Sequence, residues 1–349
     1  MTPEPTLPQS QSQSRPTLRQ VAELSGVSLK TASRVFSGGQ YVAADTAARV
    51  LSAAEQLGFR PNAIARELRA GARSSLVGLI IGDLANPFYS RIARGAERRL
   101  RAAGLRLISA STDEDPALEQ ALVSDMLDRR VSALLIVTCG ADHGYLEAER
   151  ELGTPLAFLD RGPQDIDADT VVLDNHGGVT EAVRHLVAHG HRRIGLVGDL
   201  NRLPTHRERV AAFEQAVTEA GIADWHSYVR DGSHEEESAQ SAVRDLLSLP
   251  QPPTALLTTN NRITIGALRE LRGRGAPPAL VGFDDFDLAD LLGVTVIAHD
   301  PERMGEFGAD LVLGRLAGQR GPARRVLMPT RLLARGSGER AADGRGTGP

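Results

Sequence analysis

Residues 17–36 read TLRQVAELSGVSLKTASRVF, and this stretch decides the first part of the fold. It contains two short helical segments joined by a tight turn. Thr17 is suited to cap the first helix, because a hydroxyl accepts hydrogen bonds from the free N–H groups at a helix start. Gly26 is suited to end that helix, since glycine tolerates the left-handed backbone of a helix terminus. Ser28 then caps a second helix that runs to Phe36.

A third helix is predicted from residue 44 to residue 57, where Gly58 stops it. Three short helices with a glycine turn between the first two are typical of helix-turn-helix DNA-binding domains. In these domains the second helix enters the major groove, and its N-terminal side chains face the base edges. Lys30, the only lysine of the chain, lies on this helix. The predicted DNA contacts of the domain are Thr17, Ser28, Leu29, Lys30, Thr31, Ser33 and Arg34.

The net charge of −4 is distributed unevenly along the chain. Residues 15–73 carry nine basic and four acidic side chains, a net charge of +5, so the remainder carries −9. A basic segment joined to an acidic body indicates a polyanionic partner for the first segment only. Double-stranded DNA is such a partner.

Beyond residue 74 the pattern changes, and short apolar runs alternate with amphipathic helical segments. The predicted strands are residues 76–81, 105–109, 133–137, 156–159, 170–173, 193–197, 254–258 and 279–283. The helical segments between them include residues 89–103, 178–189, 207–220 and 263–272. This alternation predicts parallel sheets covered by helices on both faces. About 260 residues exceed one small doubly wound sheet, so we expect two lobes with a cleft between them.

Composition and motif absences exclude several classes of protein. Cys139 is the only cysteine and lies in an apolar run, which excludes a disulfide within the chain and predicts a buried thiol. No apolar run is long enough to span a bilayer, and residues 1–14 lack the apolar core of a secretory signal, so we expect a cytoplasmic protein. Phosphate-loop, dinucleotide-binding and nucleophile-elbow motifs are absent, so we expect no cofactor, no catalytic residues and no enzymatic activity.

One histidine pair has the spacing of a helical zinc site. His185 and His189 are four residues apart, and His191 is close by. The residue after the first histidine is leucine, where a metalloprotease would have its glutamate base, and no third ligand is evident. We therefore expect no metal site.

Two motifs resemble one known family. Residues 17–35 closely resemble the signature of the lactose-repressor (LacI/GalR) family of bacterial regulators, and residues 58–68 (GFRPNAIAREL) resemble that family's hinge segment. The resemblance implies an N-terminal all-α helix-turn-helix domain followed by an α/β two-lobed, periplasmic-binding-protein-like domain with doubly wound parallel sheets. It also implies that the hinge folds into a helix on the operator and inserts Leu68 into the minor groove, with Asn62 and Ala65 on the same face.

The same resemblance implies an effector site in the cleft. Open α/β sheets favour this place independently, because ligands bind at the carboxyl ends of their strands. The predicted effector-binding residues follow those strand ends and are Asn86, Phe88, Tyr89, Asp160, Arg161, Thr205, Arg209, Asn260 and Asp284, together with His234 at a family position for an aromatic stacker. Asn261 differs from the aspartate that the family commonly has there. Carboxylates, amides and arginines beside a ring suit a polyhydroxylated ligand.

We therefore predict a sequence-specific transcriptional regulator, a homodimeric repressor released from a palindromic operator by a sugar-like effector. A ligand-activated or co-repressor-dependent regulator shares every motif, and a cytoplasmic sugar-binding protein or enzyme is a further alternative. No leucine heptad follows Arg335, so a coiled-coil tetramer is not predicted. The predicted parts are a disordered tail (1–15), a helix-turn-helix domain (16–60), a hinge (61–74), a two-lobed effector-binding and dimerisation domain (75–335) and a flexible tail (336–349).

Overall fold

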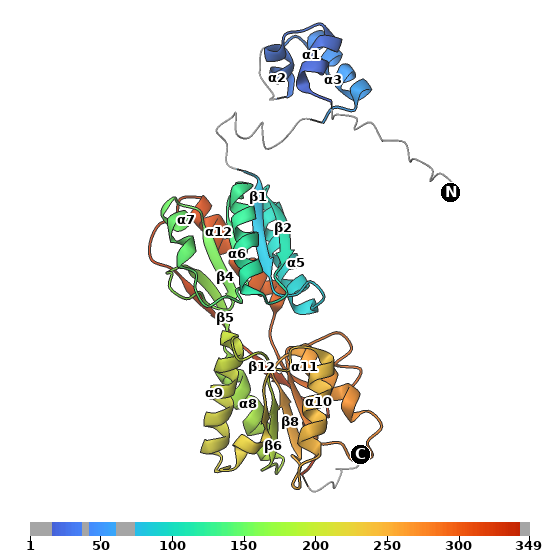
Figure 1. Ribbon diagram of the computed structural model, residues 1–349, viewed down its shortest axis with the longest axis vertical. Coiled ribbons are helices and arrows are strands. Elements are labelled where there is room, and N and C mark those ends of the chain that lie inside the picture. Colours follow the sequence, from blue (N-terminus) through green and yellow to red (C-terminus); the bar gives the residue numbers. More distant parts are fainter. Residues whose placement is uncertain (1–15, 37–41, 61–73, 343–349) are drawn as a thin grey trace, which may run out of the picture. The chain divides into compact units, whose positions relative to one another are not determined.

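The structure, a computed structural model, describes residues 16–36, 42–60 and 74–342 (Figure 1). It consists of two units, residues 1–74 and residues 75–349, which are described separately below. The hinge residues Asn62, Ala65 and Leu68 and the predicted disordered tail lie outside the described residues.

The described residues of the N-terminal unit form three short helices, as predicted: α1 (Leu18–Ser25), α2 (Leu29–Phe36) and α3 (Ala44–Leu57). Thr17 caps α1 in a reciprocal arrangement with Gln20, and Gly26 ends it with a left-handed φ of 67°. The apolar residues that face inward are small, which allows close helix packing. The core consists of Val21, Ala22, Ala32, Val50, Ala53 and Ala54.

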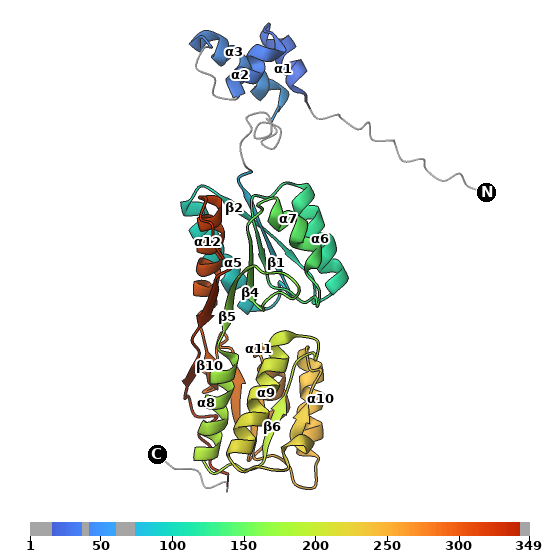
Figure 2. The ribbon, with the colours of Figure 1, turned by 90° about the vertical axis from the view of Figure 1, so that its left-hand side faces the viewer.

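The second unit has two six-stranded sheets, each the centre of one lobe. The first sheet contains β1 (Leu76–Ile81), β2 (Arg106–Ser111), β3 (Leu134–Ile136), β4 (Leu156–Asp160), β5 (Asp169–Leu173) and β11 (Arg325–Met328). Its order is β11-β5-β4-β3-β1-β2, and all neighbours are parallel. Its central strands are buried because helices cover both faces (Figure 2). These helices are α5 (Pro87–Ala102), α6 (Pro116–Asp128), α7 (Glu147–Glu151) and α12 (Pro301–Leu316), with the 3-10 turn η1 (Gly144–Leu146).

The second sheet has the order β12-β10-β9-β8-β6-β7, with β12 antiparallel to β10 and the other pairs parallel. Its strands are β6 (Ile194–Val197), β7 (Val229–Arg230), β8 (Ala255–Thr258), β9 (Ala279–Phe283), β10 (Thr295–Ala298) and β12 (Arg331–Leu333). Its helices are α8 (Asn175–Ala188), α9 (Pro204–Glu219), α10 (Glu236–Leu247) and α11 (Asn261–Leu271), with the 3-10 turn η2 (Trp225–Tyr228). The predicted two-lobed α/β body is thus confirmed.

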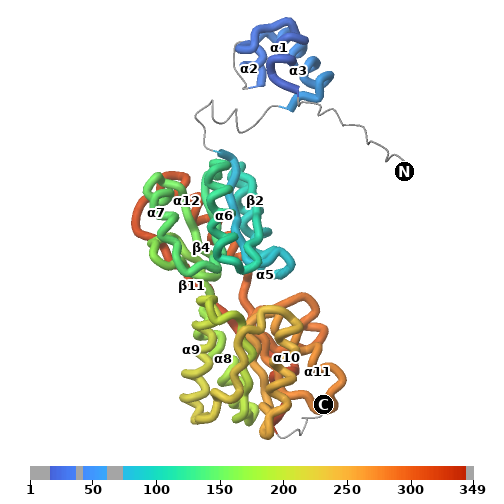
Figure 3. The backbone as a smooth tube through the Cα atoms, in the orientation of Figure 1, coloured from blue at the N-terminus to red at the C-terminus, as the bar shows by residue number. Residues whose placement is uncertain are grey.

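The chain passes between the lobes three times, after β5, after β10 and after β11 (Figure 3). As a result, α12 and β11 complete the first lobe although they follow the second lobe in sequence. In the ribbon views α12 lies beside α5, where the two helices pack closely (Figures 1 and 2).

The C-terminal segment differs from our expectation. Residues 336–342, predicted to begin a flexible tail, instead pack on the second lobe. The buried Ser337 donates to the carbonyl of Leu280 at 2.6 Å, and Thr295 donates to Glu339 at 2.8 Å. The segment is rich in glycine and charged residues, so its local composition gave no indication of these long-range contacts. In the described part of the chain, no helix combines the length and apolar character needed to cross a bilayer.

Candidate functional site

The second helix of the N-terminal unit exposes most of the predicted DNA contacts. Ala32 is buried in the three-helix core, whereas Lys30 and Arg34 on the same helix are exposed. The Ser28 hydroxyl accepts the backbone N–H of Thr31 at 3.0 Å and therefore caps α2. The other predicted contacts are Thr17, Ser28 and Leu29, which are exposed, and Thr31 and Ser33, which are half-buried. Helical packing thus leaves one polar and basic edge of α2 accessible.

In the second unit, two similar loops bring the lobes to one cavity. Gly82-Asp83-Leu84 follows β1 and leads to α5, and Gly198-Asp199-Leu200 follows β6 and leads to α9. Both glycines are required by close packing, because a Cβ on Gly82 would lie 2.2 Å from a Glu114 carboxylate oxygen and one on Gly198 would lie 2.3 Å from the His206 ring. Asp83 and Asp199, the middle residues of these two loops, both line the cavity.

The cavity between these strand ends has a volume of about 30 Å³, room for about one water molecule, so a monosaccharide requires the lobes or side chains to move. The structure brings all ten predicted effector residues together at this cavity. Its lining consists of Asp83, Asn86, Phe88, Tyr89, Asp160, Arg161, Asp199, Thr205, Arg209, His234, Asn260, Arg262 and Asp284. Sequence reasoning missed Asp83, Asp199 and Arg262, although the two aspartates also follow strand ends.

The first-lobe side of the cavity contains a buried charge cluster. Arg161 donates to both carboxylate oxygens of Glu114, at 2.6 and 3.0 Å, and also to the Tyr89 hydroxyl at 3.1 Å. All three side chains are buried, and burial raises the pKa of Tyr89 well above its ordinary value. Arg161 therefore has its terminal nitrogens satisfied within the first lobe, although we predicted it as an effector contact.

Asp160 and Asp284 occupy equivalent places at the ends of β4 and β9. Both have a left-handed backbone, with φ of 65° and 68°, which is unusual for residues other than glycine. The buried Oδ1 of Asp160 has no hydrogen-bond partner among the described residues, and burial raises the pKa of this carboxyl. Burial would also raise the pKa of Asp284, but the hydrogen bond with His299 at 2.8 Å and the charge of Arg209 hold it below its ordinary value.

Arg209 extends from α9 toward the cavity. Its Nε donates to Asn175 at 2.8 Å, one terminal nitrogen donates to the carbonyl of Thr259, and the guanidinium lies 3.7 Å above the Phe283 ring. Among the described residues, no carboxylate lies within ion-pair distance of Arg209. A cation–π contact and neutral acceptors thus hold a buried positive charge in place.

His234 is tied to Asp199, and this contact determines its position. The distance between His234 Nδ1 and the Asp199 carboxylate is 2.8 Å, and Asn260 donates to the other oxygen of Asp199 at 2.7 Å. The hydrogen bond with Asp199 raises the pKa of His234. For Asp199, burial opposes ionisation, but the contact with His234 keeps its pKa below the ordinary value.

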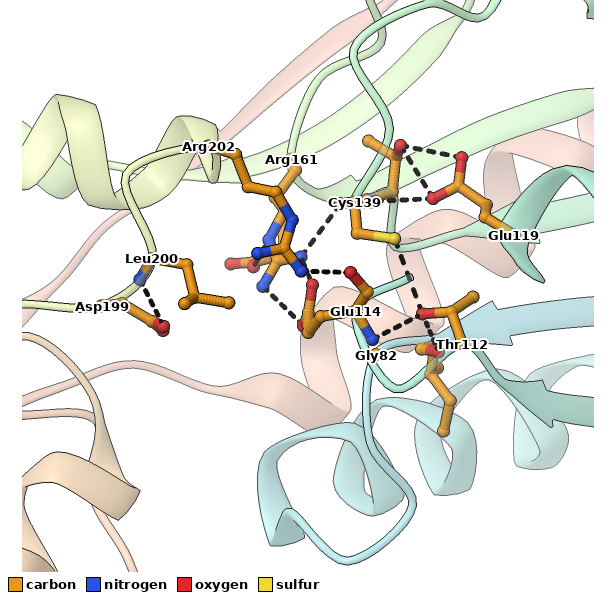
Figure 4. Close-up of polar contacts among 12 residues, drawn as sticks. Gly82, Thr112, Glu114, Glu119, Cys139, Arg161, Asp199, Leu200 and Arg202 are labelled. Carbon is orange, nitrogen blue, oxygen red and sulfur yellow. Dashed lines mark hydrogen bonds and ion pairs between the residues drawn. The ribbon is translucent and has the colours of Figure 1, made fainter. Parts of the chain in front are cut away.

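Among the described residues, four side-chain contacts join the lobes around the cavity. Arg262 of α11 pairs with Asp83 of the first lobe, and the neighbouring Asn261 donates to Asn86 at 2.8 Å. Arg202 donates to the carbonyl of Glu114, as Figure 4 shows beside the Arg161 cluster. Arg91 pairs with Asp287 at 2.8 Å. These contacts stabilise the lobes in a closed arrangement.

Two further predictions concern residues outside the cavity. Cys139 is buried, and burial raises the pKa of its thiol to about 12. In residues 16–36, 42–60 and 74–342 there is no group of three side chains placed to hold a metal ion. His185 instead lies 2.6 Å from Glu339, and His191 contacts Thr254 at 2.9 Å.

Comparison with known proteins identifies the family. Residues 17–62 match the family model of bacterial regulatory proteins, lacI family, and residues 183–338 match that of the periplasmic binding protein-like domain. The HTH-type transcriptional regulator PtxS of Pseudomonas aeruginosa is 35% identical over 341 residues, which cover 93% of this chain and 96% of PtxS. The chain belongs to the lacI family of bacterial regulatory proteins. It is therefore a DNA-binding transcriptional regulator, and both the suspected family and the predicted fold class are confirmed.

Solved structures of lacI-family regulators share this architecture. A Lac repressor dimer bound to operator and the anti-inducer ONPF has a TM-score of 0.75 and 28% identity, covering 93% of this chain and 99% of that chain. A complex of the transcriptional regulator CelR with cellobiose has a TM-score of 0.69 and 28% identity, covering 93% of this chain and 100% of that chain. The likeness extends over both units of the present lacI-family chain.

Proposed function

We propose that this lacI-family regulator is a homodimeric repressor that is released from a palindromic operator when a sugar-like effector binds between its lobes. The observation that carries the proposal is the cavity, on which thirteen polar and aromatic side chains converge from both lobes. The similar Lac repressor is a dimer on its operator, and the similar CelR binds cellobiose.

In this proposal residues 16–60 read the operator and residues 61–74 form the hinge. Lys30 and Arg34 reach base edges or phosphates from α2, since long basic side chains contact both in the major groove. Leu68 enters the minor groove, and bending the DNA offsets the few kcal/mol needed to unstack a base step.

Residues 75–335 bind the effector. Arg209 and Asp284 hold hydroxyl groups from the second lobe, and Asp160 holds them from the first. Vicinal hydroxyls both donate and accept hydrogen bonds, so a carboxylate on one side and a guanidinium on the other match them. Further contacts come from Asn86, Phe88, Tyr89, Arg161, Thr205, His234 and Asn260. The cavity side chains act in binding, without catalysis, in a protein that works in the cytoplasm at the nucleoid.

An exposed apolar surface on the second lobe supports the dimer. Leu288, Leu291 and Leu292 are 60%, 79% and 62% exposed on one loop. The adjoining hollow, about 520 Å³, is lined by apolar side chains that include Ile265 and Leu268, and also by Arg269, Arg272, Arg340 and Ser337. Apolar patches of this kind mark interaction sites. Pairing also makes the second operator contact intramolecular, which a single helix-turn-helix lacks.

The test is operator selection from fragmented genomic DNA, followed by fluorescence anisotropy of the selected duplex at physiological salt. We expect a palindromic site, and we expect a sugar to weaken binding of this site by the same factor by which the site weakens sugar binding. Strengthened operator binding with sugar would show a co-repressed regulator instead. Preference for no site over random duplex would overturn the proposal.

The variant Leu68→Ala tests the role of the hinge in operator binding independently of effector binding. We expect operator affinity to fall by about tenfold or more, because the wedge that stabilises bent DNA is lost. Effector affinity, measured by calorimetry without DNA, stays unchanged. An unaltered operator affinity in this variant would contradict the wedge role.

A further inference from the structure

Most of the cavity lining is buried, and the exceptions mark where the cavity meets the surface. Nine of the thirteen lining residues are buried, whereas Asp83, Asn86, His234 and Arg262 are partly exposed. The first two belong to the loop between β1 and α5 of the first lobe, and the other two lie beside the starts of α10 and α11 in the second lobe. These four residues therefore form the rim of the cavity, with two contributed by each lobe.

Arg262 joins the two halves of this rim. One terminal nitrogen of its guanidinium pairs with Asp83 of the first lobe, and the other pairs with Glu235 of its own lobe. The side chains of Arg262 and Asp83 are each 20% exposed, so salt and water screen this pair less than an ion pair on the open surface. Hydrogen bonds between two ionised groups are stronger than neutral ones. The rim is thus closed across the lobes by a charged bond.

The other three contacts between the lobes should hold them less firmly. Arg91 and Asp287 are 40% and 75% exposed, and ion pairs that are this exposed contribute little. Asn261 and Asn86 form a hydrogen bond without charge on either side, and Arg202 donates to a neutral main-chain carbonyl. The contact whose loss should open the rim most is therefore the pair of Arg262 with Asp83.

The closed position also has a cost for Arg262. Its Nε is buried and has no hydrogen-bond partner among the described residues. A buried donor without a partner loses its hydration without compensation. Separation of the lobes would return this N–H group to water, so the closed rim is poised to open.

We propose that Arg262 is a gate: its pair with Asp83 closes the entrance to the cavity, and molecules larger than water enter only while this pair is broken. The cavity of about 30 Å³ has room for about one water molecule, so a larger molecule must wait until the lobes separate. Glu235 holds the guanidinium at the rim from the same lobe. The inference goes beyond the proposed function, because it concerns entry into the cavity whatever molecule enters.

The test measures opening with iodoacetamide, a small neutral thiol reagent, and needs no identified effector. Thr205 lines the cavity and is 6% exposed, and Thr205→Cys places a thiol of similar size there. In the full-length protein the alkylation rate of this thiol reports how often the cavity opens, because the closed cavity excludes the reagent. Cys139 is buried and its thiol has a pKa of about 12, so its alkylation, mapped by mass spectrometry, marks global unfolding of the same molecule.

In the Thr205→Cys background, Arg262→Gln should raise the alkylation rate of the introduced thiol at least about tenfold, because the charged bond across the entrance is lost. Asp83→Asn should raise the rate by a similar factor. Glu235→Gln should raise it much less, since the pair across the lobes remains. Arg244→Gln breaks an ion pair within the second lobe, and as the matched control it should leave the rate unchanged.

Salt provides an independent check, because it screens the charges of the gate. Raising sodium chloride from about 50 mM to about 500 mM should speed alkylation when Arg262 is present and should have little effect in Arg262→Gln. If Arg262→Gln also exposes Cys139, the milder variant Asp83→Asn decides.

An alkylation rate that neither Arg262→Gln nor Asp83→Asn changes would overturn the gate. A rate with Arg262 intact that equals the rate in urea-denatured protein would also overturn it, since the cavity would already be open. Neither result affects operator selection or its response to sugars, so the proposed function is tested separately.

Discussion

Each lobe has an aspartate with a left-handed backbone at the same strand end. The surroundings of the two aspartates shift their pKa values in opposite directions. Asp284 in the second lobe accepts a hydrogen bond from His299, and its pKa is lowered despite burial. Asp160 in the first lobe has an unpartnered oxygen, and burial raises its pKa. The second lobe is thus satisfied before a ligand arrives, whereas the first leaves one buried acceptor for the ligand to satisfy.

The arginines show the reverse difference. In the first lobe the terminal nitrogens of Arg161 are engaged by Glu114 and Tyr89, while in the second lobe Arg209 is held by neutral acceptors and an aromatic ring. Each lobe therefore contributes one incompletely paired charge to the cavity, an anion from the first and a cation from the second. Strand topology alone would have assigned the two lobes equal roles. The hydrogen-bond and ion-pair partners of each side chain show that the roles differ.

The largest effect should come from Glu114→Gln, which breaks the first-lobe cluster. We expect the free energy of unfolding to fall by about 3 kcal/mol, because Arg161 loses the carboxylate that binds both of its terminal nitrogens and keeps only the Asp160 carboxylate, 3.5 Å from its Nε. Removal of a charged carboxylate in the second lobe, Asp199→Asn, should cost about 1 kcal/mol, since His234 can lose its proton when the partner is removed. Urea unfolding followed by circular dichroism measures both, and equal losses would contradict the difference between the lobes.

The variant Arg209→Ala should have a smaller effect, which we expect in effector affinity. Effector affinity should fall about a hundredfold, because charged hydrogen bonds of about 1.5–3 kcal/mol are lost, while operator affinity without effector is retained. Arg207→Ala, two residues away on the exposed side of α9, is the matched control and should respond normally. A normal response of Arg209→Ala would remove that residue from the site.

The smallest expected effect is a difference between Asp160 and Asp284 in how they make the stability of the protein depend on pH. The pKa of Asp160 is raised in the folded state, so the native protein binds the extra proton and wild-type stability falls as pH rises from about 4 through the folded pKa. Asp284 has a lowered pKa, so its contribution is present above about pH 4 and is lost as pH falls through the folded pKa. Relative to wild type, Asp160→Asn should therefore gain stability with rising pH and Asp284→Asn should lose it.

The test is to measure the free energy of unfolding of the wild type, Asp160→Asn and Asp284→Asn between pH 3 and pH 7. We expect differences of about 1 kcal/mol for each unit by which a pKa is displaced. Parallel pH profiles of the two variants would show that the partners of the two carboxylates do not distinguish them.

Local signals explain what could be predicted from the sequence. Thr17, Gly26 and Gly58 mark helix boundaries within a few residues of themselves, and the three helices of the first unit follow the prediction. The strands β1 and β9 have the predicted bounds because they are continuous apolar runs. The rule that ligands bind at the carboxyl ends of parallel strands then selected nine residues that line one cavity, and the family resemblance added His234.

Distant partners explain what was missed. The short strands β11 and β12 are partly exposed and begin with arginine, and their neighbours β5 and β10 determine their place in the sheets. Glu114 lies in an acidic loop before α6 that is typical of a solvated turn, yet Arg161, 47 positions later, makes it a buried residue. No local pattern distinguishes such a glutamate from an exposed one.

The three passages between the lobes have a consequence for protein synthesis. The first sheet lacks its edge strand until residue 328 is made, and the second lacks its own until residue 333. Domains usually fold from the N-terminus as the ribosome delivers them, but neither lobe can be completed before nearly the whole polypeptide has emerged. The small helical unit can fold long before, so a nascent chain acquires its three N-terminal helices well ahead of the cavity between the lobes.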